Sequence, residues 1–419
     1  MGRNTIRLTH SAHSLHGTVE LTGSKSESNR ALIIRAWGGD DVDVVNLSAA
    51  ADTETLKHAL AATAQEANGE ERTVIDVGPA GTAMRFLTAY LTTCRGRYLL
   101  TGSERMKQRP IGILVDALQQ LGARIQFAGV AGFPPLVIDG GFEQATDTVT
   151  VKGNVSSQYL SALLLIAPTL PKGLVLRIEG ELTSRPYLTM TLDMLREAGI
   201  HHEWQDDTIR IAPQTAHPTR LVVEPDWSAA SYWYSIAALS REASLFLPNL
   251  KSHSLQGDAA IADIMKHFGV SSSFADGGVR IQKVADSPAI DVGLLDFREC
   301  PDLAQTVIVC AAALRRDLSF TGLHTLKIKE TDRIAALQNE LGKFGVALIE
   351  EGDVYHLRTE GFNADGDLCF DTYEDHRMAM ALAPLALVFE SIRINEPEVV
   401  EKSYPDYWKH LKQHGFIIS

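Results

Sequence analysis

The sequence has few cysteines and no long apolar run, and each absence excludes a class of protein. Its four cysteines, Cys94, Cys300, Cys310 and Cys369, form no CxxC pair. This spacing supports neither a zinc ribbon nor a thioredoxin-type motif, and it is typical of reduced thiols in a cytoplasmic protein. No run reaches the roughly 18 apolar residues of a membrane span, and the N-terminal residues lack the apolar stretch of a secretion signal. We therefore expect a cytoplasmic protein.

Positive charge is also scarce. The chain has 39 basic and 52 acidic residues, which gives a net charge of −13. This balance argues against nucleic acid or an anionic membrane surface as the main partner. A cluster of cations in such a chain is a local feature.

The length requires more than one core. At 419 residues, with 45% hydrophobic and 22% charged residues, the chain has the composition of a globular protein with two or three domains. The apolar run over residues 160–170 is too short for a membrane span and contains Pro168, so it predicts a buried helix.

One pattern recurs along the chain: an apolar-periodic segment, a glycine and then alternating apolar residues. The glycines, which recur roughly every 70 to 77 residues, are Gly122, Gly199, Gly269, Gly345 and Gly415. Glycine just past a helix supplies the left-handed residue of the helix end, and the alternation that follows indicates a strand. We predict an α/β repeat used five or six times, with a degenerate first copy over residues 52–77. The alternative is that such turns are simply common in α/β proteins.

The repeats divide into two groups of about three. A strand-like segment ends at Val223, and Pro225 precedes a helix start at residues 228–230. We therefore expect an inserted domain over residues 23–224 and a discontinuous domain made of residues 1–22 plus 225–419. The chain would cross between them twice, which is the connectivity of a hinge.

Four expected helix starts carry a cation near the positive end of the helix dipole. They lie at residues 25–30, 81–85, 329–333 and 375–377. An exposed cation there costs roughly 0.3–1 kcal/mol, and an anion bound in front of the turn removes that cost. Helix N-termini combined with Arg or Lys bind phosphates and carboxylates. The four starts predict a strongly anionic ligand; the alternative is solvated helix starts with local ion pairs.

Several further polar segments are weak evidence for a binding site when each is taken alone. A basic loop precedes residues 109–112, hydroxyls begin the apolar helix at residues 156–158, and residues 184–187 are similar. Asp302 stands before a helix expected over residues 303–314, and Lys402 lies in a late loop. Each alone is equally well explained as a cap or a solvated loop.

Together and in this order, the motifs closely resemble the 5-enolpyruvylshikimate-3-phosphate (EPSP) synthase family over residues 23–407. The matching segments are residues 23–30, 80–85, 109–112, 156–158, 329–333, 375–380 and 402–406. The resemblance implies an α/β fold of two similar domains, each made of three βαβαββ units in an inside-out α/β barrel. It also implies transfer of the enolpyruvyl group of phosphoenolpyruvate to the 5-hydroxyl of shikimate 3-phosphate, through a tetrahedral intermediate and with release of phosphate. No metal, organic cofactor, nucleic acid or membrane is implied, and we expect a monomer.

Site residues follow from the resemblance position by position. The expected acid/base groups are Asp302, Glu330 and Lys25. The expected shikimate 3-phosphate ligands are Lys25, Ser26, Arg30, Ser156, Ser157, Gln158, Ser184, Asp302 and Lys329. The expected phosphoenolpyruvate ligands are Lys25, Gly81, Arg109, Gln158, Arg333, Arg377 and Lys402. The inserted domain would carry those up to Ser184 and the discontinuous domain the others.

Three positions depart from the family pattern, and rival functions remain to be weighed. Pro79 and Thr325 stand where the family usually has Asn, and Phe86 stands where it usually has Pro. We expect Pro79 and Phe86 to weaken inhibition by glyphosate, which in this family occupies the phosphoenolpyruvate subsite. The alternatives are the UDP-N-acetylglucosamine enolpyruvyl transferase, which usually has Cys or Asp in the loop at residues 103–109, an RNA 3′-phosphate cyclase and a non-catalytic paralogue that binds anions.

Overall fold

Four strands and two helices form a unit that recurs along the chain. The computed structural model describes residues 4–10, 12–65, 72–284 and 293–419. A clear copy consists of β4 (Thr73–Asp76), α3 (Gly81–Thr93), β5 (Arg97–Thr101), α4 (Gly112–Leu121), β6 (Arg124–Phe127) and β7 (Leu136–Asp139). The sheet order is β4-β5-β7-β6. The first pair is parallel and the others are antiparallel, as expected when a helix crosses over between the first two strands and a hairpin closes the unit.

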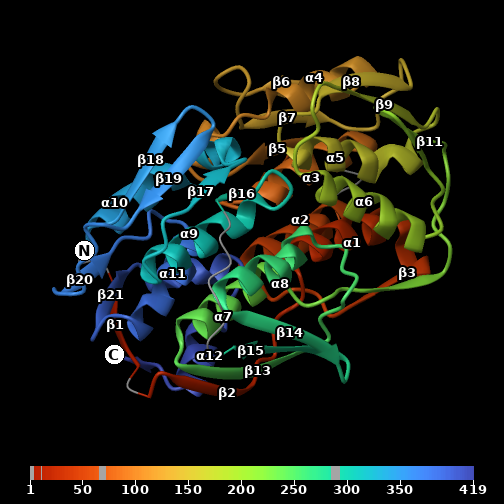
Figure 1. Ribbon diagram of the computed structural model, residues 1–419. Helices are drawn as coiled ribbons and strands as arrows, with labels where there is room; N and C mark the ends of the chain where they lie inside the picture. The colour runs from red at the N-terminus through yellow and green to blue at the C-terminus, as the bar shows by residue number, and fades with distance from the viewer. Residues whose placement is uncertain (1–3, 11, 66–71, 285–292) are drawn as a thin grey trace. The chain divides into compact units, whose positions relative to one another are not determined.

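The chain divides into two compact units, and this copy belongs to unit 2, Gly23–Val223 (Figure 1). A second copy comprises β8 (Thr148–Lys152), α5 (Ser157–Ile166), β9 (Leu174–Glu179), α6 (Arg185–Glu197), β10 (Glu203–Gln205) and β11 (Thr208–Ile211). Its sheet has the same order, β8-β9-β11-β10. The remaining elements are α1 (Lys25–Gly38), β3 (Val42–Val45), α2 (Ala51–Gln65) and β12 (Thr219–Val222). Here β3 pairs only with β12 among the described strands, so this copy is reduced, and residues 66–71 of the predicted degenerate repeat lie outside the described residues.

Unit 1, Met1–Thr22 and Glu224–Ser419, contains three four-stranded sheets within the described residues. The first copy is β2 (Ser14–Thr18), α7 (Trp227–Leu239), β13 (Glu242–Pro248), α8 (Ile261–Ile264), β14 (Val270–Ala275) and β15 (Gly278–Lys283). The second is β16 (Leu294–Asp296), α9 (Ala304–Ala313), β17 (Ser319–Thr321), α10 (Arg333–Gly342), β18 (Ala347–Glu351) and β19 (Val354–Arg358). The third is β20 (Leu368–Phe370), α11 (His376–Leu382), β21 (Ile392–Asn395), α12 (Tyr407–Gln413), β22 (Ile417–Ile418) and the N-terminal β1 (Thr5–Thr9).

The third copy takes its last strand from the other end of the chain. The strand β1 pairs antiparallel with β21 and β22, in the order β20-β21-β1-β22. In the first copy, the whole of unit 2 is inserted between β2 and α7. The predicted α/β repeat is confirmed, and its regular strand order explains why the glycine pattern returns at nearly constant spacing.

The five repeat glycines all have positive φ angles, between 76° and 111°. Gly345 also has no room for a side chain, because a Cβ atom there would lie 1.9 Å from the carbonyl oxygen of Gly361. Two α-helices tighten into 3₁₀ turns. The helix α11 begins at His376 and becomes 3₁₀ at Ala383, because Pro384 has no N–H to donate. The short helix α8 continues as a 3₁₀ turn over Met265–Phe268.

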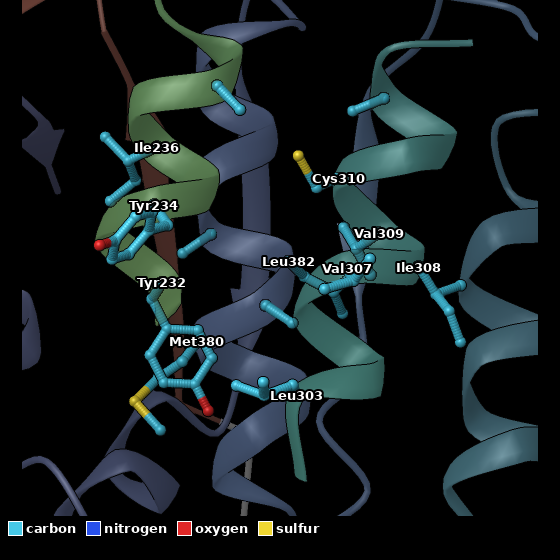
Figure 2. Close-up of a cluster of buried hydrophobic side chains, with 14 of the residues drawn as sticks. Tyr232, Tyr234, Ile236, Leu303, Val307, Ile308, Val309, Cys310, Met380 and Leu382 are labelled. Carbon is cyan, nitrogen blue, oxygen red and sulfur yellow. The ribbon is translucent and has the colours of Figure 1, made fainter. Parts of the chain in front are cut away.

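The core of unit 1 contains three helices that are apolar on nearly every face. Figure 2 shows α7, α9 and α11 side by side, with Tyr232, Val307 and Met380 among the packed side chains. Every residue of α9 is buried, and its small residues allow close packing of its neighbours. Ser228, Asp302 and Arg377 lie at the N-terminal ends of these helices.

In unit 2, α5 occupies the corresponding interior position. The apolar run predicted as a buried helix forms α5 and a 3₁₀ turn over Ala167–Thr169, and residues 159–168 are buried. Among the described residues, no helix has the length and apolar character needed to cross a membrane.

Candidate active site

Asp302 is the centre of a charged web in unit 1. It lies on a 3₁₀ turn, Pro301–Leu303, that leads into α9. Its Oδ1 atom accepts from Arg333 Nη1 at 3.1 Å, and its Oδ2 atom accepts from Arg377 Nη2 at 2.9 Å. The ammonium of Lys329 lies 3.9 Å from Oδ1. Its carboxylate therefore faces three cations, and a helix cap alone does not explain these contacts.

Arg333 joins the carboxylates of this web. Asp332 caps α10 by accepting from the backbone N–H groups of Ile334 and Ala335, which fixes Arg333 as the first helical residue. The Arg333 side chain is 2% exposed, and besides Asp302 it donates to Asp375 at 2.7 Å and to Glu330 at 3.0 Å. A buried guanidinium held by three carboxylates is rigidly oriented because its planar fork fixes the donor directions.

Glu330 extends the web to Lys402, whose Nζ atom lies 3.9 Å from Glu330 Oε1. All six residues predicted for this unit therefore belong to one network. Its cations are Lys329, Arg333, Arg377 and Lys402, and its carboxylates are Asp302, Glu330 and Asp375. Four cations against three carboxylates favour binding of a further anion.

The charges shift the pKa values of the web. Burial alone would raise the pKa of Asp302, but Arg377, Lys329 and Arg333 outweigh it and hold the pKa well below its usual range. Burial would lower the pKa of Arg333, but Asp375, Glu330 and Asp302 raise it above its ordinary value. Asp302 is thus ionised at neutral pH, which is the state required of a base.

Asp375 positions Arg377 through the backbone. Its side chain caps α11 by accepting from the Arg377 N–H at 2.8 Å, while it also binds Arg333. The Arg377 guanidinium then reaches Asp302, the hydroxyl of Tyr232 at 3.4 Å and the hydroxyl of Ser228 at 3.3 Å. The starts of α7, α10 and α11 thereby converge on the turn before α9.

In unit 2, Arg30 is the most enclosed of the predicted residues. It is 2% exposed. It donates to the Ser26 carbonyl, the Tyr187 carbonyl and two hydroxyls, those of Ser161 and Thr191. Four of its five N–H donors are therefore bound to neutral protein acceptors, and burial lowers its pKa to about 10.

Two aromatic rings cover the guanidinium of Arg30. Its Cζ atom lies 5.4 Å from the centroid of Phe86 and 5.8 Å from that of Tyr187. Cation–π contacts of this kind are worth about 0.5–2 kcal/mol. The unusual Phe86 therefore contacts a residue predicted to bind shikimate 3-phosphate, a contact that the sequence did not reveal.

Lys25 and Gln158 each lie at the start of a helix in unit 2. Lys25 is the first residue of α1, and its Nζ atom lies 3.2 Å from Asp52 Oδ2. Gln158, near the start of α5, donates to the Thr82 hydroxyl on α3 at 3.2 Å. These contacts tie α1 to α2 and α5 to α3.

Gly81 and Arg109 are in direct proximity. A Cβ atom at Gly81 would lie 2.6 Å from Arg109 Nη1. The absence of a side chain at this helix start therefore lets the guanidinium approach the backbone. Arg85 strengthens the same region, because it donates to the Pro110 carbonyl at 2.9 Å, next to Arg109.

The predicted serines lie at helix starts with available hydroxyls. Ser156 precedes α5 and Ser157 begins it, while Ser184 precedes α6 with a φ angle of 56°. Within the part of the chain that the structure describes, neither Ser156 nor Ser184 makes a side-chain capping bond. Helix N-terminal N–H groups with hydroxyls beside them in the sequence are groups of the kind that bind an oxyanion.

Several residues that contact the site arginines were not predicted from the sequence. The sequence places Asp375 only at the start of a helix, and it indicates no contact of Ser228, Tyr232 or Phe86 with the arginines of the site. A polar residue near a helix start signals some of them, but their partners lie far away in the sequence. Among the described residues, no group of three or more His, Cys, Asp or Glu side chains is arranged to hold a metal ion.

Comparison with known proteins identifies the family. The family model of EPSP synthase (3-phosphoshikimate 1-carboxyvinyltransferase) matches residues 10–411. The chain is 48% identical over 408 residues to the 3-phosphoshikimate 1-carboxyvinyltransferase of Bacteroides fragilis, covering 96% of each chain. It is 36% identical over 423 residues to that of Vibrio cholerae, covering 95% of this chain and 97% of the other.

Solved structures agree on the fold. EPSP synthase from Acinetobacter baumannii superposes with a TM-score of 0.76 at 20% identity, covering 99% of this chain and 100% of the other. The enolpyruvyl transferase NikO from Streptomyces tendae gives a TM-score of 0.72 at 15% identity, covering 100% and 99%. The predicted family is confirmed: the chain belongs to the EPSP synthase (3-phosphoshikimate 1-carboxyvinyltransferase) family of enzymes.

Proposed function

We propose that this enzyme transfers the enolpyruvyl group of phosphoenolpyruvate to the 5-hydroxyl of shikimate 3-phosphate and releases phosphate, as a step of aromatic amino acid biosynthesis in the cytoplasm. Family membership over nearly the whole chain supports the reaction. The observation that carries the assignment of residues is the web around Asp302, where cations outnumber carboxylates by one. The four cysteines are free thiols, in keeping with a reducing compartment.

The reaction is an addition followed by an elimination. In the addition, the 5-oxygen bonds to C2 of phosphoenolpyruvate, C3 gains a proton and the hydroxyl loses one, which gives a tetrahedral ketal phosphate. In the elimination, the C2–O bond to phosphate breaks, C3 loses a proton and the C2–C3 double bond forms again. The enzyme therefore needs a base for the hydroxyl, a group that gives and retrieves a proton at C3, and cations for the phosphate and carboxylates.

Asp302 and Glu330 are assigned to the two proton transfers. Asp302 is ionised because its three neighbouring cations outweigh burial, so its carboxylate is in the state that can accept the hydroxyl proton. Glu330 is held by Arg333 and lies near Lys402, and we assign it the proton at C3. Lys25 is a third candidate, since its ammonium would also stabilise developing negative charge.

Arg333, Arg377 and Lys402 in unit 1 are assigned to phosphoenolpyruvate, together with Lys25, Gly81, Arg109 and Gln158 in unit 2. The geometry in unit 1 supports this, because Arg333 and Arg377 are both fixed by Asp375 and Asp302 before any ligand binds. Preorganised donors lose little conformational entropy on binding an anion.

Shikimate 3-phosphate is assigned to Lys25, Ser26, Arg30, Ser156, Ser157, Gln158, Ser184, Asp302 and Lys329. Arg30 has one N–H left after its four protein acceptors, so we assign it a single hydrogen bond to the carboxylate, which the Ser26 hydroxyl would supplement. The helix starts at Ser156, Ser157 and Ser184 are assigned to the phosphate.

The test is phosphate release by the purified protein. Phosphoenolpyruvate with shikimate 3-phosphate should give one phosphate per enolpyruvyl product, and UDP-N-acetylglucosamine as acceptor should give none. Release with the nucleotide sugar alone would favour the rival transferase. No release with either acceptor would favour a non-catalytic paralogue.

A further inference from the structure

A buried carboxyl group in unit 1 has no role in the reaction as assigned above. Asp258 is 3% exposed and lies on a 3₁₀ turn, Gly257–Ala260, that precedes α8. Its Oδ2 atom accepts a hydrogen bond from the hydroxyl of Ser228, near the start of α7. The Ser228 oxygen in turn accepts from Arg377 Nη2 at 3.3 Å. A chain of two hydrogen bonds thus connects Asp258 to a cation of the web.

The surrounding contacts fix both ends of this chain. Gln256 accepts from the backbone N–H of Trp227 at 2.9 Å and donates to the Pro225 carbonyl at 2.9 Å. These bonds hold the turn that carries Asp258 against the start of α7. Asp226 caps α7 by accepting from the N–H of Ala229, which places Ser228 in the first helical turn.

The direction of the hydrogen bonds is chemically specific. Ser228 has a single hydroxyl proton, and donating it to Asp258 turns the oxygen lone pairs toward other donors. A hydroxyl oriented in this way is an acceptor for Arg377, which presents the same Nη2 atom to Asp302 at 2.9 Å. Without Asp258, the hydroxyl proton would be free to rotate toward Arg377 and repel it.

We propose that Asp258 is a positioning residue that acts through Ser228 to hold the Arg377 guanidinium in its phosphoenolpyruvate-binding orientation. This inference rests on the proposed function of Arg377. It deepens that function by naming a pair of residues, outside the ligand contacts assigned above, that sets the affinity for one of the two substrates.

The electrostatic surroundings agree with a supporting role. Burial, followed by the nearby Asp302, raises the pKa of Asp258 to about 7, while Arg377 and the Ser228 hydroxyl oppose the shift. A fully ionised Asp258 would bring the carboxylates of this region to four and cancel its excess of cations. A carboxyl that remains partly protonated orients the hydroxyl and preserves the positive charge that an anionic substrate meets.

The test compares four variants by steady-state kinetics with both substrates. Ser228→Ala and Asp258→Ala should raise KM for phosphoenolpyruvate about tenfold, because a hydrogen bond that orients a charged group is lost. KM for shikimate 3-phosphate and kcat should stay within about twofold. Ser228→Thr keeps the hydroxyl and should restore most of the affinity, and Asp258→Asn, which keeps an acceptor, should lie between wild type and Asp258→Ala.

Ser231→Ala is the matched control. Ser231 lies on the same helix, and its hydroxyl donates to the Ser228 carbonyl at 2.6 Å but has no contact with Arg377 in the described structure. It should leave both KM values near wild type. Thermal unfolding of each variant separates loss of folding from loss of positioning, and Ser228→Ala decides the question if Asp258→Ala does not fold.

A double variant gives the sharpest result. If both residues act on Arg377 through one chain, Ser228→Ala with Asp258→Ala should be no worse than either single variant. Unchanged KM for phosphoenolpyruvate in folded Ser228→Ala, or an equal rise for both substrates, would overturn the inference. Failure of the proposed function is distinct, since the wild-type protein would then release no phosphate from the two substrates.

Discussion

The two units hold their buried arginines in opposite ways. Arg333 in unit 1 is surrounded by the carboxylates of Asp302, Glu330 and Asp375, which raise its pKa. Arg30 in unit 2 donates to neutral carbonyls and hydroxyls between two aromatic rings, and its pKa is lowered to about 10. Arg333 therefore holds its neighbouring carboxylates in place. Arg30 is a buried charge with neutral partners, and a bound ligand carboxylate would offset the free-energy cost of its burial.

The largest effect is expected from the carboxylates around Arg333. Asp302→Asn and Glu330→Gln are nearly isosteric and remove only an ionisable proton carrier. Each should lower kcat by about 10²–10⁴, the usual contribution of a general acid or base. Asp263→Asn, an exposed position paired with Lys266, is the control. Wild-type turnover in both site variants would remove these residues from the mechanism.

Replacing Arg333 and Arg30 should lower the free energy of unfolding by different amounts, because their partners differ in charge. Arg333→Met removes the cation that three carboxylates share, of which Asp375 is fully buried, and should lower the free energy of unfolding by about 3–5 kcal/mol. Arg30→Met leaves neutral acceptors unsatisfied and should cost about 1–3 kcal/mol. Urea unfolding measures both. The exposed Arg298, paired with Asp296, provides Arg298→Met as a control within about 1 kcal/mol. Equal costs for the two buried arginines would contradict the comparison.

The aromatic cover of Arg30 gives a smaller expected effect. Phe86→Leu keeps the volume apolar but removes the ring, so Arg30 should be less firmly held. We expect KM for shikimate 3-phosphate to rise about three- to tenfold with little change for phosphoenolpyruvate, in line with a cation–π contact of about 0.5–2 kcal/mol. Phe362→Leu removes a similar ring, 4.3 Å from Arg315, and is the control. A selective effect on phosphoenolpyruvate would instead favour the expectation that Phe86 alters the glyphosate subsite.

The smallest effect is expected from pH. Because the pKa of Asp302 is held well below its usual value in the folded chain, its contribution to stability is present above the unfolded pKa of about 3.9 and is lost as pH falls through the folded pKa. Wild type and Asp302→Asn should therefore show a difference in unfolding free energy that changes little around pH 5, which lies below the pKa of about 7 that Asp302 helps to raise in Asp258. Below about pH 4 the unfolding free energy of wild type should fall relative to that of Asp302→Asn.

Local sequence patterns predict the repeat well because its signals are local. Gly345 and the other repeat glycines have the positive φ angles that the pattern requires, and the helices at residues 25 and 333 begin where polar residues precede apolar periodicity. Periodicity does not reveal where an α-helix tightens into a 3₁₀ turn, as the chain does directly after α8 and α11. Family membership and fold are confirmed, whereas the roles of individual site residues stay predictions.

Contacts between distant residues could not be predicted in this way. Asp258 lies 30 residues from Ser228 in the sequence, and Arg377 lies 149 residues from it. The covering of Arg30 by Phe86 and Tyr187 likewise depends on the packing of three helices. Helix propensity and capping patterns describe each helix alone. Which side chains of different helices contact each other is decided only when the helices pack.

The exchange of strands between the ends of the chain has a consequence for biosynthesis. The strand β1 is made before the whole of unit 2, yet its partners β21 and β22 are made after it. Unit 2 is continuous in sequence and so has all its strands available well before synthesis ends. We expect unit 2 to become protected from proteolysis on the ribosome while the N-terminal segment still waits for the final strands, since domains generally fold as they emerge. Unit 1 would then be complete only when β21 and β22 have left the ribosomal tunnel.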